Sequence, residues 1–493
     1  MKHLIEFISR ALYAFLICVG VTFTSCEGFE LPGSDNDETP EKEVPATINL
    51  DDVESFSATL TGRLNVDASE VPFTRVSILY SSDNIFHIDT ADTLSTSSFD
   101  EQQNYSITLT GLKCLTEYHY CLYVKVRAEE FYGELQSFTT LKHPYLIESD
   151  IDPSSATDLS SSASANCYIV SEAGTYKFKA VKGNSETPVG DVASATILWE
   201  TFGTDKTPEL FDLIGGTCHK DGCILFKTAD SFREGNAVIS ANDAEGKILW
   251  SWHIWLTDQP QEQVYFNDAG TMMDRNLGAI AADPGHVGAL GLLYQWGRKD
   301  PFLSSSSINE GIEAMSTITW PERVKSESST GTIEYTIANP TTFIGMSLGA
   351  NNDWHYTDDQ SNDNTRWTTS ENAKSIYDPC PVGWRVPDGG ENGIWAKAIG
   401  FSSKLFIESD KINRGMNFSG IFGPDQTIWY PSGMRNSGSG TLISEFTRGN
   451  NWSASTVGYS AYDLSFHNGS NNIAYPSHAG LRDRGQSVRC CKE

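Results

Sequence analysis

The chain has few basic residues for its length. Lysine and arginine number 35 against 64 aspartates and glutamates, a formal net charge of −29 over 493 residues. Nucleic acids and anionic membrane surfaces are bound through basic patches that neutralise phosphate, so this balance argues against both as partners. Long apolar runs are also scarce: residues 11–23 are too few to span a bilayer, which takes about 20 helical residues. The ten histidines form no metal-spaced pair.

Aromatic residues, in contrast, are plentiful. With 12 tryptophans, 19 tyrosines and 24 phenylalanines, the chain can build hydrophobic cores, unlike disordered chains. Its length suggests roughly two to four domains. Apolar segments separated by runs of serine, threonine, glycine and asparagine predict short strands joined by many turns, and hence a mostly β, multidomain protein.

The first 26 residues predict export and a lipid anchor. Lys2 and Arg10 form a basic start before the apolar run, which is typical of a signal peptide over residues 1–25. Residues 23–26 resemble a bacterial lipobox, in which Cys26 becomes the lipidated first residue of the mature protein. Ordinary cleavage, with Cys26 an incidental residue, is the alternative.

Residues 26–45 form an acidic segment without apolar periodicity, which predicts a flexible tether. Its acidic run, residues 34–38, resembles the surface-export signal of Bacteroidetes lipoproteins. That resemblance implies a lipid-anchored protein on the outer face of the outer membrane, and a solvated spacer is the alternative.

Residues 46–142 alternate apolar and polar side chains with period two, which predicts half-buried strands. Leu112, Thr116 and Tyr118 resemble the tyrosine corner of fibronectin type III domains, although Cys114 stands where proline is usual. The resemblance implies a fibronectin type III-like β-sandwich that acts as a spacer. A serine-rich linker at 143–165 follows it.

A second β-sandwich is predicted over residues 166–261. Within it Trp250 and Trp252 share one face of a strand and Trp255 shares the other, so this strand is expected to be buried on both faces. Cys218 and Cys223 flank a predicted hairpin turn and could pair across it. A zinc site there lacks a second ligand pair.

Residues 262–493 are richer in glycine, asparagine and tryptophan, with short helices expected at 289–296 and 393–399. Four stretches in this order, MMDRNLGA (272–279), GLLYQWGRKDPF (291–302), YDPCPVGWRVP (377–387) and RGQSVRC (484–490), resemble the Fibrobacter succinogenes major paralogous domain. The resemblance implies a C-type-lectin-like α+β fold and says little about activity.

Within that topology a disulfide is predicted between Cys380 and Cys490. Cys490 alternates with Val488 toward the core in the last strand, while Cys491 points the other way. Cys491 is then the unpaired thiol, or the alternative partner if a bulge shifts the alternation. The sequence leaves open whether Cys114, Cys121 and Cys167 are paired.

The predicted binding residues lie in loops of this last region. Trp354, Trp367 and Trp429 offer rings that can stack on sugar faces or cap the core. The carboxylates Asp358, Asp359 and Asp363 offer oxygen ligands for calcium, with a solvated acidic loop as the alternative. A Gly-x-Ser-x-Gly stretch at 345–349 precedes loop sequence and lacks the strand–turn–helix setting of a nucleophile elbow.

These observations predict a cell-surface lipoprotein whose C-terminal domain binds carbohydrate or mediates adhesion without catalysis, in association with fimbriae or a glycan-capture system. No catalytic residue and no resident cofactor are predicted. The competing interpretations are a surface hydrolase that acts on glycans, with two carboxylates across a cleft, and a structural fimbrial subunit with a donor strand or groove.

Overall fold

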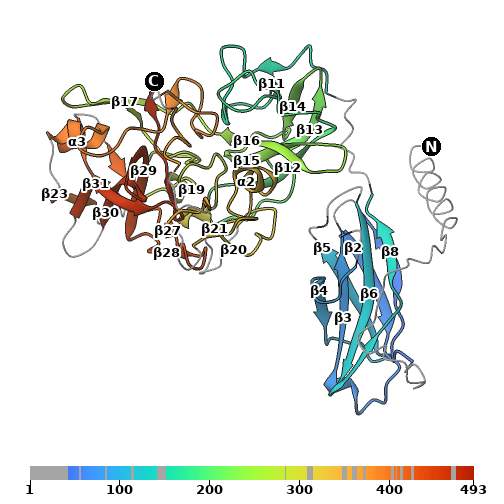
Figure 1. The fold of residues 1–493 in the computed structure, drawn as a ribbon. Helices are drawn as coiled ribbons and strands as arrows, with labels where there is room; N and C mark the ends of the chain where they lie inside the picture. Colours follow the sequence, from blue (N-terminus) through green and yellow to red (C-terminus); the bar gives the residue numbers. More distant parts are fainter. Residues whose placement is uncertain are drawn as a thin grey trace. The chain divides into compact units, whose positions relative to one another are not determined.

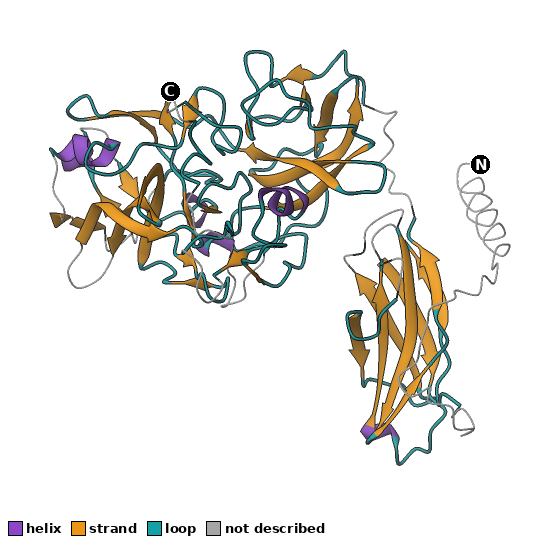
Figure 2. Cartoon of the chain, viewed as in Figure 1, coloured by secondary structure: helices purple, strands orange, loops and turns teal. Residues whose placement is uncertain are grey.

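The structure is a computed structural model of the chain. It describes residues 43–54, 57–83, 86–110, 112, 116–141, 151–283, 285–307, 315–346, 352–357, 363–369, 373–400, 405–406, 408–410, 415–423, 427–467 and 473–493. The chain divides into two compact units, Met1–His143 and Pro144–Glu493, and strands make up most of the regular structure in both (Figure 2). Cys26 and the predicted tether up to residue 42 lie outside the described residues.

The N-terminal unit is a β-sandwich of two antiparallel sheets (Figure 1). One sheet has the order β1-β2-β5, and the other has the order β4-β3-β6-β7, with β8 also pairing with β6. The strands are β1 (Asn49–Val53), β2 (Ser57–Arg63), β3 (Thr74–Ser81), β4 (Asp92–Thr96), β5 (Asn104–Thr110), β6 (Glu117–Val126), β7 (Glu129–Tyr132) and β8 (Gln136–Thr139). This confirms the predicted fibronectin type III-like sandwich.

The period-two pattern explains this core. In β5, Tyr105, Ile107 and Leu109 are buried while the residues between them are exposed. Tyr118, the residue of the predicted tyrosine corner, is buried and stacks on Phe138 with ring centroids 5.7 Å apart. Each sheet therefore turns one apolar face toward the other.

The C-terminal unit begins with a second pair of four-stranded sheets. The first has the order β10-β16-β15-β12, and the second has the order β13-β14-β11-β9. The strands are β9 (Thr157–Asp158), β10 (Cys167–Val170), β11 (Thr175–Lys179), β12 (Ser194–Thr201), β13 (Ile214–Lys220), β14 (Cys223–Thr228), β15 (Gly235–Asn242) and β16 (Ile248–Leu256). This region is the β-sandwich predicted from the sequence.

Strand β16 is buried on both faces, as its sequence predicted. Trp250 and Trp252 lie in the core between the two sheets, whereas Trp255 belongs to a different core. That second core also contains Trp199 of β12 and residues of the last region, including Trp296 and Trp452. The predicted division after residue 261 thus falls between segments that share a core.

The last region contains a long mixed sheet in the order β23-β31-β30-β29-β32-β27-β28, with β19 pairing β32, and a four-stranded sheet β17-β18-β33-β22. The strands of the long sheet are β19 (Leu293–Gln295), β23 (Leu405–Phe406), β27 (Met434–Arg435), β28 (Leu442–Ile443), β29 (Arg448–Val457), β30 (Ser460–His467), β31 (Ile473–Leu481) and β32 (Gly485–Ser487). Those of the other sheet are β17 (Glu262–Tyr265), β18 (Gly270–Met273), β22 (Trp384–Arg385) and β33 (Cys491–Lys492).

Shorter elements complete this region. The pair β20 (Val324–Lys325) and β21 (Ile344–Gly345) is parallel. A three-stranded sheet joins β24 (Glu408–Asp410), β25 (Gly415–Asn417) and β26 (Ile428–Trp429). The helices include α2 (Ile333–Ala338), α3 (Ile394–Ile399) and α4 (Ser419–Phe422). No described helix is long and apolar enough to cross a membrane.

One of the two predicted helices is confirmed and the other is wrong. Helix α3 ends at Gly400, which has φ of 73° and closes the helix in the left-handed conformation. Residues 289–296 instead contain β19, because Leu293 and Gln295 pair with β32 near the end of the chain. A pairing so distant in sequence outweighs the local helical pattern.

The predicted disulfide between Cys380 and Cys490 is present, with Cα atoms 6.1 Å apart. Cys491 is outside any disulfide and lies buried in β33, as expected for the unpaired thiol. The bridge ties the segment before β22 to the residue before β33, and these two strands also pair directly.

Candidate functional site

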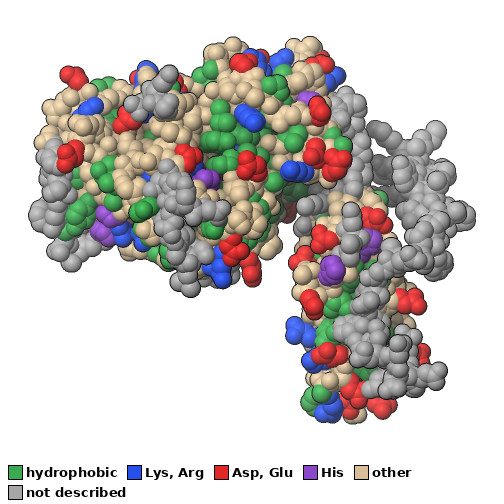
Figure 3. Space-filling view, in the orientation of Figure 1, with side chains coloured by type: hydrophobic (Ala, Val, Ile, Leu, Met, Phe, Trp, Pro, Cys, Tyr) green, Lys and Arg blue, Asp and Glu red, His purple; other side chains and the backbone are tan. Residues whose placement is uncertain are grey.

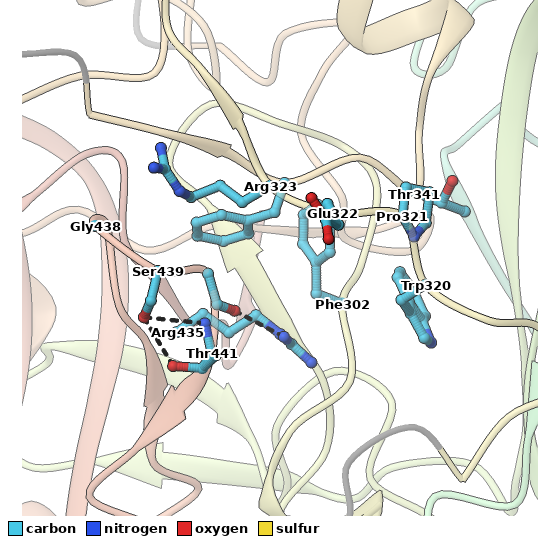
Figure 4. Close-up of a pocket in the computed structure, with 12 residues that line it drawn as sticks. Phe302, Trp320, Pro321, Glu322, Arg323, Thr341, Arg435, Gly438, Ser439 and Thr441 are labelled. Carbon is cyan, nitrogen blue, oxygen red and sulfur yellow. Dashed lines mark hydrogen bonds between the residues drawn. The ribbon is translucent and has the colours of Figure 1, made fainter. Parts of the chain in front are cut away.

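A pocket of about 480 Å³ opens in the C-terminal unit between two short segments (Figure 4). One wall is residues 320–323, which lead into β20, and the other is the turn 438–441 between β27 and β28. The rings of Phe302 and Phe343 lie between them. The volume falls within the range of roughly 300–1,000 Å³ that small-molecule sites occupy.

The aromatic lining is well ordered by mutual contacts. Phe302 and Phe343 are buried and meet edge to face at 5.3 Å, and Trp320 packs 5.9 Å from Phe302. The indole N–H of Trp320 donates to Ser316 Oγ at 2.9 Å. One edge of Trp320 is therefore fixed by the core, and the side chain stays partly exposed where it lines the pocket.

The facing turn is built by Asn436 and two glycines. Asn436 Oδ1 accepts hydrogen bonds from the backbone N–H groups of Gly438 and Ser439. Gly440 has φ of 73°, and a Cβ there would stand 3.2 Å from Arg323 and 3.4 Å from Phe343. Glycine at this position lets the turn approach the other wall closely.

Polar groups are arranged along the rim. Ser439 and Thr441 are exposed, and their hydroxyl groups are hydrogen-bonded to each other at 2.7 Å. Glu322 is exposed, and Arg323 is half-buried beside it. Arg435 is committed to the fold, because its Nε donates to the Leu303 carbonyl and its Nη1 to the Gly440 carbonyl.

A buried charge network lies in the same unit. Asp353 forms ion pairs with both Arg366 and Arg482, and all three side chains are nearly inaccessible to solvent. Asp483, the residue that follows Arg482, is also buried, and neither of its carboxylate oxygens has a hydrogen-bond partner. Burial, with a smaller contribution from Asp353, raises the pKa of Asp483 to about 7.

The tryptophans predicted to stack on sugar are not at the surface, which corrects that prediction. Trp354, Trp367 and Trp429 have no solvent exposure. The indole N–H of Trp354 donates to the carbonyl of Trp296, and that of Trp367 donates to the carbonyl of Arg298. Trp354 and Trp367 lie in loops and Trp429 lies in β26, and other parts of the unit cover all three, so the rings serve as core residues.

Exposure separates Trp320 from nearly all other tryptophans. Of the twelve in the chain, ten are fully buried, and only Trp320 and Trp384 are partly exposed. Sequence reasoning did not select Trp320. The sequence pattern that indicates its exposure is the run Trp-Pro-Glu-Arg, because proline favours an extended backbone and two charged residues keep the segment near solvent.

The structure describes one of the three predicted calcium ligands, Asp363. Asp358 and Asp359 lie outside the described residues. Asp363 Oδ1 accepts from both the backbone N–H and the hydroxyl of Thr365, so it closes a local turn. The described residues contain no group of three metal-ligand side chains, and the calcium site remains a prediction.

The remaining candidates from the sequence are five cysteines and the Gly-x-Ser-x-Gly stretch. No disulfide joins Cys218 to Cys223, because the register of β13 and β14 sets Cys218 opposite Leu225 and Cys223 opposite Lys220. Among the remaining cysteines, Cys121 and Cys167 are buried thiols. Residues 347–349 of the Gly-x-Ser-x-Gly stretch lie outside the described residues, as does Cys114.

Comparisons with known proteins add little to this geometry. No protein-family model and no curated protein matches the chain. Among solved structures, the sensor domain of the anti-sigma factor RsgI4 of Pseudobacteroides cellulosolvens is 24% identical, with 20% of this chain and 98% of that chain covered and a TM-score of 0.16. The fn3 domain of human collagen alpha-1(XX) is 16% identical, with 22% and 92% covered and a TM-score of 0.16. At these values the similarity says nothing about function.

Proposed function

We propose that the chain is a cell-surface lipoprotein whose C-terminal unit binds carbohydrate in the pocket beside Trp320, without catalysis. The observation that carries the proposal is the combination of a partly exposed indole with Glu322, Arg323 and the hydroxyl groups of Ser439 and Thr441 in one pocket. Sugars present apolar C–H faces to aromatic rings and hydroxyl groups to carboxylates, guanidinium groups and hydroxyls. This pocket supplies both kinds of partner.

The proposal includes a position in the cell and a fold for the binding region. The signal peptide, Cys26 and the acidic tether support a lipid anchor and an outer-membrane location facing outward. The four sequence stretches that resemble the Fibrobacter succinogenes major paralogous domain, together with the Cys380–Cys490 bridge, support a C-type-lectin-like fold for residues 262–493. The fibronectin type III-like unit would act as a spacer.

The alternative, a glycan hydrolase, is less well supported by this pocket. Glycoside hydrolysis ordinarily uses a pair of carboxylates about 5–10 Å apart. Among the described residues that line the pocket, Glu322 is the one carboxylate. A structural fimbrial subunit is the second alternative, and it would bind a partner strand and no free sugar.

The test is binding of the purified full chain to a glycan panel, with and without a calcium chelator. Trp320→Ala is expected to weaken binding by about 1 kcal/mol or more, roughly fivefold in Kd, because a stacking ring is lost. Glu322→Gln is expected to weaken it as well, and since this exposed side chain has no hydrogen bond in the described structure, folding should be unaffected.

Trp384→Ala is the matched control, because Trp384 is the other partly exposed tryptophan and does not line the pocket. Circular dichroism would confirm that each variant is folded. Binding that is equally insensitive to all three substitutions would contradict the assignment of the pocket. Release of a cleaved sugar would favour the hydrolase, and no binding to any glycan would favour the structural subunit.

A further inference from the structure

A group of basic side chains lies on one face of strands β29, β30 and β31. Strand pairing places Arg448 opposite His467, and Asp463 opposite His478. Arg484 follows β31 in the turn to β32. Figure 3 shows histidine and basic side chains near β30, at the lower left edge of the C-terminal unit. We call Arg448, His467, His478 and Arg484 the arginine–histidine cluster.

The one carboxylate among these residues is already engaged. Asp463 is fully buried, and its Oδ1 lies 2.7 Å from His478 Nδ1. Its Oδ2 accepts a hydrogen bond from Asn450 at 3.2 Å. The contact holds the imidazole by Nδ1, and the His478 side chain remains 31% exposed. Asp463 thus fixes His478, and His478 is the one basic side chain with which it forms an ion pair in the described part of the chain.

Neither Arg448 nor Arg484 forms a direct ion pair in the described part of the chain, although the charge of Asp463 acts on Arg448 and that of Arg484 acts on Asp483. Arg448 Nη2 donates to Ser465 Oγ at 3.2 Å, and its buried Nε has no partner. In the described part of the chain the Arg484 guanidinium makes neither an ion pair nor a hydrogen bond, and its Nε is also buried. Strands β29 and β32 run parallel with Asn451 beside Ser487, so Arg448 and Arg484, each three residues earlier, lie at the same end of this strand pair. Burial lowers the pKa of Arg448, Asp463 opposes that shift, and Arg484 lowers the pKa further.

This arrangement is unusual for so acidic a chain. Acidic residues outnumber basic ones by 64 to 35, yet neither of these two guanidinium groups forms an ion pair in the described part of the chain. Leaving a buried charged donor without a partner costs free energy. The buried side-chain amide of Gln486 also lacks hydrogen-bond partners. It lies near Asp463, since a Cβ on Gly480 would stand 2.7 Å from Asp463 Oδ2 and 2.8 Å from Gln486 Nε2.

We propose that the arginine–histidine cluster binds the oxyanion of a small acidic ligand, such as the carboxylate or sulfate of an acidic sugar. A guanidinium group presents paired N–H donors whose spacing matches two oxygens of such an anion. Arg448 and Arg484 supply these donors, and the exposed side of His478 supplies a third contact. The site is made by β29–β31, whereas the Trp320 pocket is lined from other segments.

Isothermal titration of the full chain in low salt tests this proposal. The probes are sodium sulfate, sodium phosphate and sodium glucuronate, with glucose as the neutral comparison. At least one anion is expected to bind while glucose at the same concentration does not. Tighter binding of glucuronate than of the inorganic anions would identify a sugar acid, and the reverse order would identify a sulfate or phosphate group.

Arg484→Gln is expected to weaken binding of the anion at least tenfold. This guanidinium has no partner in the described structure, so its loss should leave the fold intact, which circular dichroism checks. Arg448→Lys keeps the charge and removes the paired donors, and a similar loss is expected. Arg233→Gln is the matched control, since Arg233 is an exposed arginine of the same unit, paired with Asp212, and its removal changes the net charge equally.

Two results would overturn the proposal: no binding of any of the three anions at millimolar concentration, or equal affinity in Arg484→Gln and Arg233→Gln. Trp320→Ala separates this site from the proposed glycan pocket. If the pocket assignment is wrong and the oxyanion site is right, Trp320→Ala and the unaltered chain bind the anion alike, while the arginine variants still lose it.

Discussion

Asp353 Oδ1 lies 2.9 Å from Arg366 Nη1 in a region where neither side chain reaches solvent. Arg482 forms an ion pair with the other carboxylate oxygen, and both guanidinium groups lie over the ring of Trp296. One carboxylate therefore neutralises two buried cations that come from segments more than 100 residues apart in sequence.

The first prediction concerns this network. Asp353→Ala is expected to lower the free energy of unfolding by about 3–5 kcal/mol, because two buried guanidinium groups lose the one carboxylate with which they form ion pairs in the described part of the chain. Chemical denaturation of the full chain measures it. Asp230→Ala, at a side chain that is 91% exposed, is the control and should change stability little. Equal stability of the two variants would contradict the importance of the network.

The second prediction concerns the disulfide. Cys380 and Cys490 are 110 residues apart, so removing the bridge with Cys380→Ser and Cys490→Ser together should cost about 4–5 kcal/mol in the loop-entropy model. Peptide mapping without reduction should find the two cysteines joined. In the folded chain Cys491 should resist alkylation, because burial raises the pKa of its thiol to about 12. Recovery of alkylated Cys380 from folded protein would refute the bridge.

The third prediction is a pH dependence. Because the folded pKa of Asp483 is raised to about 7, the folded chain holds this proton more tightly than the unfolded chain does. Stability from this group is full below a pH of about 4 and falls as pH rises toward 7. Asp483→Asn should reduce this decrease in the free energy of unfolding by on the order of 2–4 kcal/mol.

Urea denaturation of both proteins at several pH values between 4 and 8 measures the difference. Asp230→Asn is the control for the loss of an exposed carboxylate. Parallel stability curves for the unaltered chain and Asp483→Asn would show that Asp483 titrates in the folded chain as it does in the unfolded chain.

The fourth prediction concerns the anchor. When cells that express the chain grow with a radiolabelled fatty acid, the protein should become labelled. Cys26→Ala should abolish the label and release the protein from the membrane fraction. The reason is the basic start, the short apolar run and the small residues before Cys26. Equal solubility and equal absence of label in both proteins would rule out lipidation.

Local sequence patterns predicted the elements whose partners lie nearby in the chain. The alternation in β5 and β16, the end of α3 at Gly400 and the inward direction of Cys490 follow from geometry within a few residues. The failed helix at 289–296 depended instead on pairing with β32. Such pairing is decided by the whole fold and leaves no trace in a short window.

The candidate site was harder to predict for the same reason. A tryptophan in a loop can stack on a ligand or fill a core, and only the segments that cover it decide between the two. Trp354 and Trp367 are covered, whereas Trp320 is held at one edge by Ser316 and stays partly exposed. The proximity of Arg448 and Arg484 likewise depends on how β32, which follows the turn after β31, pairs with β29.

The burial of β16 on both faces bears on how this chain can be inherited. Trp252 packs in one core and Trp255 in the other, so this one strand contributes side chains to two cores of the C-terminal unit. A recombination event near residue 261 would separate Trp255 from Trp296 and leave a wide apolar face on each fragment. The segment from Pro144 to Glu493 should therefore pass between genes as one block, while the N-terminal sandwich can be gained, lost or duplicated independently.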